Sequence, residues 1–263
     1  MATAPVPFPT FDLLGMPLAR VDARGLLDHV FASLALGRGG WIVTANLDFL
    51  RRHAHDLDAR ALYESADVRV ADGMPLVWAA RLQGVRLPER IAGSSLVLPI
   101  AERAAREGRS IYLLGGEPAA NARAADVLRA QHPGLNICGA SSPMVASPPT
   151  ADQTRALREE LARARPDVVL VGMGSPKQEH IIHALRADFP AAWMIGVGIS
   201  FSFVAGMVSR APEWMQQAGL EWCWRLAQEP KRLARRYLLE DIPFSFELFG
   251  RTAWRRLRSS AAP

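Results

Sequence analysis

Polar residues and glycines follow three apolar runs of this chain, at the points where buried strands would end. They are Thr44 and Asn46 after the first run, Asp72 and Gly73 after the second, and Gly174, Gln178 and Glu179 after a later one. In open α/β sheets the carboxyl ends of the strands meet at one edge, and ligands bind there. We therefore expect these residues to lie together and to bind a substrate.

The last of these segments has the features of an anion-binding loop. Residues 168–171 are continuously apolar, as expected of a strand that is buried on both faces of a parallel sheet. Gly172 and Gly174 allow a tight turn, and Pro176 suits the first position of a helix. The free N–H groups at such a helix start favour an anion, commonly a phosphate. The alternative is an ordinary strand-to-helix connection.

Asp72 and Arg90 are the two candidates for catalysis. A carboxylate at the tip of a strand, followed by a glycine, is placed as a general base would be. The alternative is that Asp72 caps a helix that begins near Pro75. Arg90 lies just before a segment that could start a helix, and its planar guanidinium could hold a diphosphate or a leaving group. Its alternative is a surface ion pair with Glu89 or Asp67.

The elements that would position these residues alternate between strands and helices. Apolar runs predict strands at residues 41–44, 68–70, 110–114, 135–138, 168–171 and 192–197. Helical patterns occur at residues 23–36, 48–65, 75–82, 94–106, 118–131 and 151–164. This order predicts an α/β fold with a Rossmann-like, mostly parallel sheet flanked by helices.

Beyond Arg210 the pattern is helical only. We expect residues 1–210 to form the Rossmann-like domain and residues 211–263 to form a helical C-terminal appendage. From Arg225 onward there are nine Lys and Arg residues against four Asp and Glu, and the net charge of the whole chain is +5. Aromatic residues are mixed with these arginines, a composition typical of surfaces that lie on membranes. No RNP-type motif is present, so nucleic acid is not expected, and a solvated helix face is the plain alternative.

Cysteine and hydropathy patterns argue against several other classes. Cys138 and Cys223 are far apart and lack metal-ligand spacing, which indicates reduced thiols in the cytosol, without a disulfide framework or a zinc site. The N-terminus lacks the basic and apolar regions of a signal peptide. Residues 189–209 are uncharged, but their glycines and proline indicate a buried strand and a turn, not a membrane span.

Two further motifs are expected to be structural. His53-Ala-His-Asp-Leu-Asp58 contains a DxD sequence but lies within a polar helical run, away from any strand end. Gly196-Val-Gly198 is only half of a dinucleotide fingerprint, with no suitable acidic residue about 20 positions later. We therefore expect neither a metal ion nor another cofactor.

Several segments, taken in order, resemble the WecG/TagA/CpsF family of bacterial glycosyltransferases, also called glycosyltransferase family 26. The resemblance covers most of the chain. It rests on Thr44-Ala-Asn46, Ala71-Asp-Gly-Met-Pro75, Leu87-Pro-Glu-Arg90, Tyr112-Leu-Leu-Gly-Gly116, Gly172-Met-Gly-Ser-Pro-Lys-Gln-Glu179, Arg210-Ala-Pro212, Gly219-Leu-Glu-Trp222 and Arg225-Leu-Ala-Gln-Glu-Pro230.

The resemblance implies an inverting, metal-independent enzyme that is peripheral on the cytoplasmic face of the cell membrane. Such enzymes move a sugar from UDP to a lipid-linked acceptor, typically N-acetylglucosamine on undecaprenyl diphosphate. By the same resemblance Asp72 deprotonates the acceptor hydroxyl, and Arg90 contacts a diphosphate. Thr44, Asn46 and Gln178 would lie at the substrates.

The resemblance also implies that the C-terminal appendage contacts the membrane and completes the active site. We assign this membrane or acceptor contact to four residues, Arg225, Arg232, Arg235 and Arg236. The sequence leaves the oligomeric state open, a homo-oligomer included.

The donor sugar is less closely defined than the reaction. Ser95 and Ser202 stand where the family often has an aspartate, which bears on the choice of donor. An N-acetylmannosamine-type sugar is favoured, for bacterial cell-surface polysaccharide synthesis. The alternatives are a glucosyl donor for exopolysaccharide assembly and a non-catalytic module that binds anionic lipid or nucleic acid.

Overall fold

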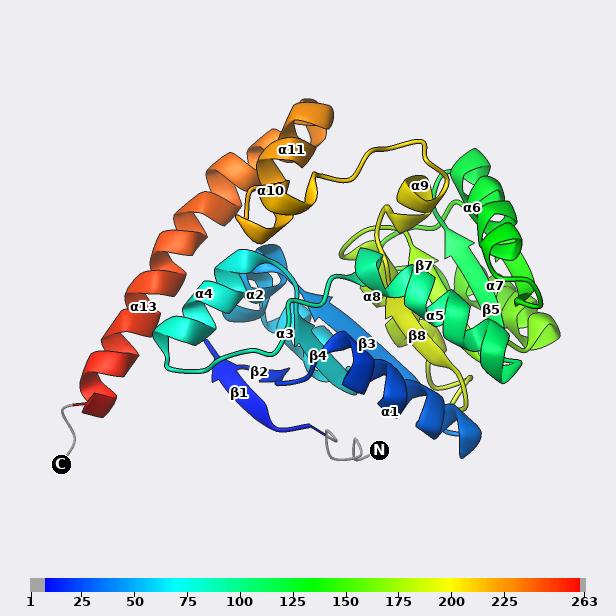
Figure 1. Ribbon diagram of the computed structural model, residues 1–263, viewed down its shortest axis with the longest axis horizontal. Coiled ribbons are helices and arrows are strands. Elements are labelled where there is room, and N and C mark those ends of the chain that lie inside the picture. Colours follow the sequence, from blue (N-terminus) through cyan, green and yellow to red (C-terminus); the bar gives the residue numbers. More distant parts are fainter. Residues whose placement is uncertain (1–7, 261–263) are drawn as a thin grey trace.

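A parallel sheet of six strands forms the centre of the molecule in the computed structural model, which describes residues 8–260 without the side chains of Arg232, Ser259 and Ser260. The strands are β3 (Gly40–Ala45), β4 (Val68–Ala71), β5 (Ser110–Gly115), β6 (Asn136–Ser141), β7 (Val168–Gly172) and β8 (Trp193–Gly196). Their spatial order is β4-β3-β8-β7-β5-β6 (Figure 1). All neighbouring pairs are parallel, so every carboxyl end lies at the same edge.

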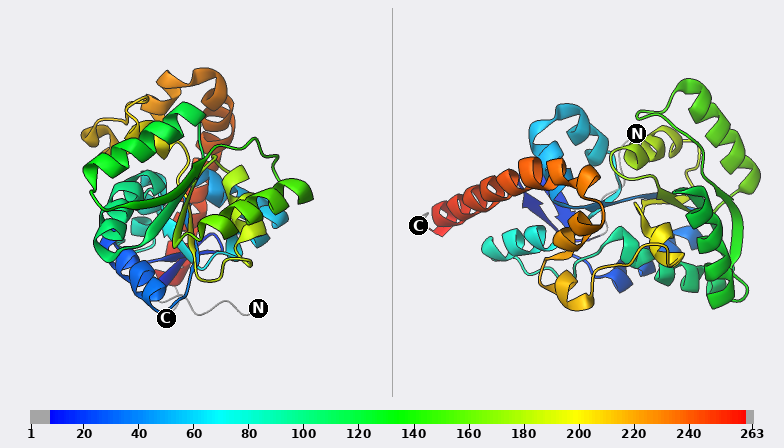
Figure 2. Two further views of the ribbon diagram at one scale, coloured as in Figure 1. Left: turned by 90° about the vertical axis from the view of Figure 1, so that its right-hand side faces the viewer. Right: turned by 90° about the horizontal axis from the view of Figure 1, so that it is seen from above.

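Helices cover both faces of this sheet (Figure 2). One face is packed by α1 (Ala23–Ala35), α5 (Gly93–Glu107), α6 (Pro118–Gln131) and α9 (Ser200–Val204). The other is packed by α2 (Leu47–His55), α3 (Leu57–Glu64), α7 (Ala151–Ala164) and α8 (Lys177–Leu185). Successive strand residues alternate between the two cores, with Leu113 in one and Leu114 in the other, and both are buried. Burial on both faces explains why the strands are largely apolar, except for the edge strand β6, which is partly exposed.

The structure confirms the α/β class and the six strands at their predicted positions. The helix predicted at residues 48–65 is wrong in one respect, because it divides at Asp56 into α2 and α3. Asp56 accepts hydrogen bonds from the N–H groups of Asp58 and Ala59 and so caps α3. Pro176 was predicted at the first position of a helix, but it is the N-cap residue, one position before the start of α8.

An antiparallel hairpin of β1 (Thr10–Leu13) and β2 (Met16–Ala19) was not predicted. Its turn at Leu14 and Gly15 has φ angles of 51° and 92°. Arg69 on β4, which is buried, joins the hairpin to the sheet. The guanidinium donates hydrogen bonds to four backbone carbonyls, those of Pro17, Tyr63, Glu64 and Ala66.

The chain beyond Arg210 forms helices only in its described part, as predicted. They are α10 (Glu213–Gln217), α11 (Glu221–Gln228), α12 (Pro230–Ala234), the π-helix η1 (Arg235–Asp241) and α13 (Ile242–Ser260). α13 packs on α2 and on α4 (Met74–Leu82), and η1 packs on α2 (Figure 1). Among the described residues no helix has the length and apolar character needed to cross a membrane. A domain boundary at residue 210 stays a prediction.

Replacing Arg69 with methionine should lower the free energy of unfolding by about 2–4 kcal/mol, because buried carbonyls lose a charged donor. Denaturant unfolding followed by circular dichroism measures the change. Arg129→Met is the matched control, since Arg129 is exposed on α6 and pairs with the exposed Asp126. The control should change stability by less than about 0.5 kcal/mol. Equal effects of the two substitutions would contradict the role given to Arg69.

Candidate active site

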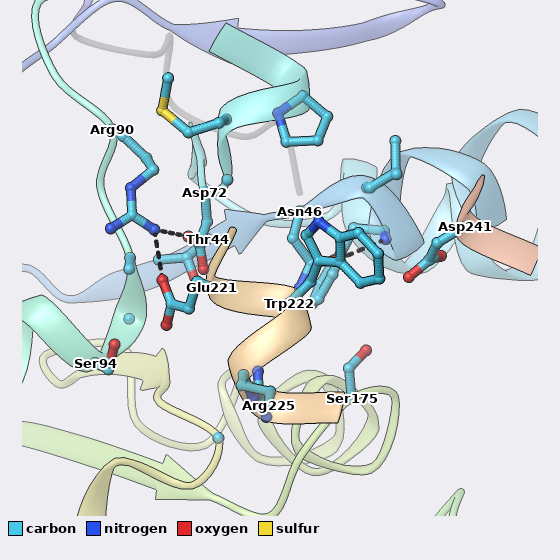
Figure 3. Close-up of a pocket in the computed structure, with 18 of the residues that line it drawn as sticks. Thr44, Asn46, Asp72, Arg90, Ser94, Ser175, Glu221, Trp222, Arg225 and Asp241 are labelled. Carbon is cyan, nitrogen blue, oxygen red and sulfur yellow. Dashed lines mark hydrogen bonds and ion pairs between the residues drawn. The ribbon is translucent and has the colours of Figure 1, made fainter. Parts of the chain in front are cut away.

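A cavity of about 520 Å³ opens at the carboxyl edge of the sheet (Figure 3). Its walls come from the ends of β3, β4, β7 and β8, and from α4, α10, α11, η1 and α13. The sheet therefore supplies one side of the cavity, and the C-terminal helices supply the other. Open α/β sheets bind their ligands at this edge.

Asp72 lies in the wall of the cavity, directly after β4. Its N–H donates to the carbonyl of Ala45 at 2.7 Å, which continues the pairing of β4 with β3. The N-cap of α4 is Gly73, at φ 102°, and no side chain caps this helix. The alternative role of Asp72 as a helix cap is therefore wrong, and its carboxylate faces the cavity (Figure 3).

Arg90 faces Asp72, with 3.5 Å between Nη1 and the carboxylate Oδ1. The same Nη1 lies 3.2 Å from Oε2 of Glu221 on α11, and Nη2 donates to Oε1 of Gln216 on α10 at 3.3 Å. Burial raises the pKa of Asp72 to about 6, while the charge of Arg90 lowers it and that of Glu221 raises it. A carboxyl group with such a pKa can accept a proton near neutral pH.

The surface ion pairs considered for Arg90 do not form. Glu89 accepts a hydrogen bond from the N–H of Ala23, and Asp67 pairs with Arg186 at 2.7 Å. Arg90 is instead part of the cavity wall, with 18% of its side chain exposed. It is therefore accessible to an anionic ligand.

Thr44 and Asn46 line the cavity at the end of β3. Oδ1 of Asn46 accepts hydrogen bonds from the N–H groups of Asp48 and Phe49 at 3.1 and 3.3 Å, so it caps α2. The cap uses only Oδ1, and Nδ2 is left as the group that can donate to a ligand. Thr44 is packed by Gly93 of α5, where a Cβ would lie 3.2 Å from its Oγ1.

Gln178 joins the loops that follow β7 and β8. Its Oε1 accepts a hydrogen bond from the N–H of Gly198 at 3.1 Å, and its side chain is buried. Gly196 leaves room for this contact, because a Cβ there would overlap the Gln178 amide. Gly174, at φ 70°, lies in the same wall. Residues 196–198, set aside as half of a dinucleotide fingerprint, thus line the cavity.

Glu179, expected at the substrate, does not line the cavity. Its side chain is 2% exposed, and burial raises its pKa to about 7 against the opposing charge of Arg52. Glu179 is therefore a buried neighbour of the site.

The four arginines assigned to the membrane or the acceptor separate in the structure. Arg225 and Arg236 line the cavity. Arg235 points to solvent, with 85% of its side chain exposed. The side chain of Arg232 lies outside the described part of the chain. Arg225 and Arg236 therefore lie where an acceptor could contact them, and a contact of these arginines with the membrane or the acceptor stays a prediction.

Further cavity residues come from the C-terminal appendage and were not predicted individually. They are Gln216 and Glu221, which contact Arg90, Trp222, whose ring meets that of Tyr237, and Asp241, which pairs with Arg236. Burial raises the pKa of Asp241 to about 6, and its Oδ2 lies 3.3 Å from Nε of Arg236. The motif Gly219-Leu-Glu-Trp222 is a sequence signal for Glu221, whereas no motif marks Asp241.

The histidines of the DxD segment have structural partners. His53 is buried with Nε2 3.2 Å from Glu64, and Nε2 of His55 lies 3.0 Å from Glu247. Asp56 of the same segment caps α3. In residues 8–260 no three His, Cys, Asp or Glu side chains are grouped as metal ligands.

The parallel sheet and the charged cavity at its carboxyl edge are those of a Rossmann-like ligand-binding protein. The family model described as glycosyl transferase WecG/TagA/CpsF matches residues 11–259. The chain therefore belongs to the WecG/TagA/CpsF family of glycosyltransferases. This family acts in cell-surface polysaccharide synthesis, with a sugar-nucleotide donor and a lipid-linked acceptor.

Asn46→Ala should lower the free energy of unfolding by about 1 kcal/mol, because α2 loses its N-cap. Asn46→Asp should be clearly less destabilising, since a carboxylate oxygen can accept from the same two N–H groups. Unfolding of the two variants in denaturant measures the difference. Equal losses in both would show that Oδ1 of Asn46 does not act as a cap.

Proposed function

We propose that the protein is an inverting glycosyltransferase that moves a sugar from a UDP-sugar to a saccharide linked to a polyprenyl diphosphate. The observation that carries this proposal is the carboxylate of Asp72 in the cavity wall, 3.5 Å from the guanidinium of Arg90, in a member of this family. Asp72 as a base and Arg90 as a cation thus lie side by side at the place where the donor and the acceptor would react.

In this mechanism the ionised Asp72 removes the proton from an acceptor hydroxyl. The acceptor oxygen attacks C1 of the donor sugar while the bond from C1 to the UDP oxygen breaks, so the configuration at C1 inverts. The proton ends on Asp72, and the electron pair leaves with UDP. Arg90 and Arg225, which both line the cavity, stabilise the charge on the departing diphosphate and take the part that a divalent metal would otherwise play.

For the donor we favour an N-acetylmannosamine-type sugar, on the family resemblance. Ser94 lines the cavity at the start of α5, and Ser95 accepts a hydrogen bond from Nη2 of Arg210 at 3.0 Å. An aspartate at position 95 would pair with Arg210, whereas this chain holds the arginine with a neutral hydroxyl. A glucosyl donor for exopolysaccharide assembly is the alternative that this difference keeps open.

Release of UDP by the purified protein tests the proposal. The donors are UDP-N-acetylmannosamine, UDP-N-acetylmannosaminuronic acid, UDP-glucose and UDP-N-acetylglucosamine, each with and without N-acetylglucosamine on a polyprenyl diphosphate. We expect acceptor-dependent release with one donor, unchanged by EDTA. Silence with all four, from folded protein that binds vesicles, would contradict the proposal and favour the module that binds anionic lipid or nucleic acid.

Asp72→Asn should reduce the turnover number by about 10² to 10⁴, the contribution of a positioned base. The wild-type rate should rise with pH through about 6, because only the ionised carboxylate accepts a proton and burial raises the pKa of Asp72 to about 6. Above that pH the variant should be at least as stable as the wild type, which then buries a charged carboxylate. Steady-state rates between pH 5 and 8 measure the effect. Unchanged turnover in the folded variant would remove Asp72 from the mechanism.

The C-terminal helices supply the contact that we propose with the cytoplasmic face of the membrane. Exposed apolar side chains recur on one face of η1 and α13, and we call this set the apolar stripe: Leu239, Phe246, Trp254 and Leu257. Arg251 and Arg258 border it. A helix of this kind lies in the interface of an anionic membrane. Ser245 and Phe249 of the same helix line the cavity, so a lipid-linked acceptor could reach the site from the bilayer.

Replacing both Phe246 and Trp254 with glutamate should weaken binding to vesicles that contain phosphatidylglycerol by at least about tenfold, because two apolar side chains no longer enter the bilayer. Co-sedimentation with vesicles measures the affinity. The matched control replaces Leu36 and Met144, which are 70% and 91% exposed, with glutamate. If the control loses binding to the same extent, the apolar stripe is not the membrane contact.

A further inference from the structure

The carboxylate of Glu221, in the cavity wall, pairs with Arg90, which also lines the cavity, and with Arg210, which is not part of the lining. Its Oε2 is 3.2 Å from Nη1 of Arg90, and its Oε1 is 3.9 Å from Nε of Arg210. Arg225, four residues further along α11, lines the same cavity (Figure 3). One carboxylate therefore bridges two cations, of which Arg90 precedes α5 and Arg210 precedes α10.

These cations are only partly satisfied by the protein. Nε of Arg210 and Nε of Arg225 are buried, and neither has a hydrogen-bond partner among the described residues. The contacts of Arg90 with Asp72, Glu221 and Gln216 are all between 3.2 and 3.5 Å. Even with both acids ionised, three arginines face two carboxylates. A ligand with more than one negative charge would match this group better than Glu221 does.

We propose that Glu221 holds the place of a diphosphate: its carboxylate bridges Arg90 and Arg210 in the unliganded protein and leaves when a diphosphate binds there. This inference rests on the proposed function, which requires a diphosphate-bearing ligand. Carboxylate and phosphate present similar paired oxygens, and guanidinium groups bind both through the same N–H donors. The exchange replaces one charge contact with stronger ones and forms or breaks no covalent bond.

The segment that carries Glu221 can shift without uncovering a core. No residue of α10 or α11 is buried. Arg90 contacts both helices, through Gln216 of α10 and Glu221 of α11. Between them Gly219, at φ 72°, lies so close to Trp78 of α4 that a Cβ would overlap the indole ring. Gly219 would thus stay in place while the start of α11 turns and Glu221 moves away from Arg90.

The test compares the wild type, Glu221→Gln and Glu213→Gln by isothermal titration calorimetry. The probes are inorganic pyrophosphate, UDP and uridine. Glu213→Gln is the matched control, because Glu213 is exposed on α10 near Gln217 and its replacement removes the same charge. Glu221→Gln should bind pyrophosphate and UDP about threefold to tenfold more tightly than the other two proteins, as expected of one partly exposed charge contact. Uridine should bind all three proteins alike.

Three results would overturn the inference. They are an affinity of Glu221→Gln for pyrophosphate no higher than that of Glu213→Gln, an equal gain with uridine, and no measurable binding of pyrophosphate to any of the three. The transferase assay is independent of these. Tighter binding of pyrophosphate by Glu221→Gln, without sugar transfer from any donor, would support the inference and reject the proposed function. Sugar transfer without tighter binding would support the proposed function and reject the inference.

Discussion

Arg90 connects the two parts of the chain that enclose the cavity. From the sheet side it faces Asp72, and from the C-terminal helices it contacts Gln216 and Glu221. A guanidinium can serve several acceptors at once, because it has five N–H donors in one plane. α10 and α11 bury no residue, and polar contacts of this kind hold them in place together with the packing of Trp222 on Tyr237. The shape of the cavity and the proton affinity of Asp72 thus depend on the same cation.

A second charged group has a comparable effect at the other end of the cavity. Asp48 of α2 is fully buried and accepts hydrogen bonds from Arg51 at 2.7 Å and Arg52 at 3.1 Å. Arg236 of η1 lies 3.7 Å from Asp48 and 3.3 Å from Asp241. Ion pairs removed from water add little stability, since desolvation offsets much of their attraction. Their effect here is to determine where η1 lies on α2.

Sequence patterns were sufficient for the parts of the fold in which local and tertiary preferences agree. The five strands other than the edge strand β6 are buried along nearly their whole length, and they are mostly apolar. Thr44, Asn46 and Asp72 could be placed at one edge because they follow such runs. The β1-β2 hairpin could not be found in this way. β1 alternates between exposed and buried residues over only four positions, and β2 does not alternate, while the buried Arg69 that joins them to the sheet is a tertiary contact.

The position of the remaining site residues is set by how the C-terminal helices pack over the carboxyl edge of the sheet. Glu221 meets Arg90 across 131 positions of sequence, a distance at which spacing carries no information. Arg236 was predicted to contact the membrane or the acceptor, but composition does not show which side of a helix faces the cavity. Glu179 lies behind the wall for a related reason. Its neighbour Gln178 lines the cavity, and adjacent positions on a helix point in different directions.

The π-helix η1 imposes a constraint on chain length. Arg236 and Asp241 both face the cavity and pair with each other, although residues five apart on an α-helix point about 140° apart. The wider turn of a π-helix brings them to the same side. Each residue gained or lost within η1 would turn everything after it about the helix axis. The number of residues in η1 therefore determines in which direction α13 presents its apolar side chains relative to the cavity. Surface loops accept insertions and deletions, but these seven residues should not.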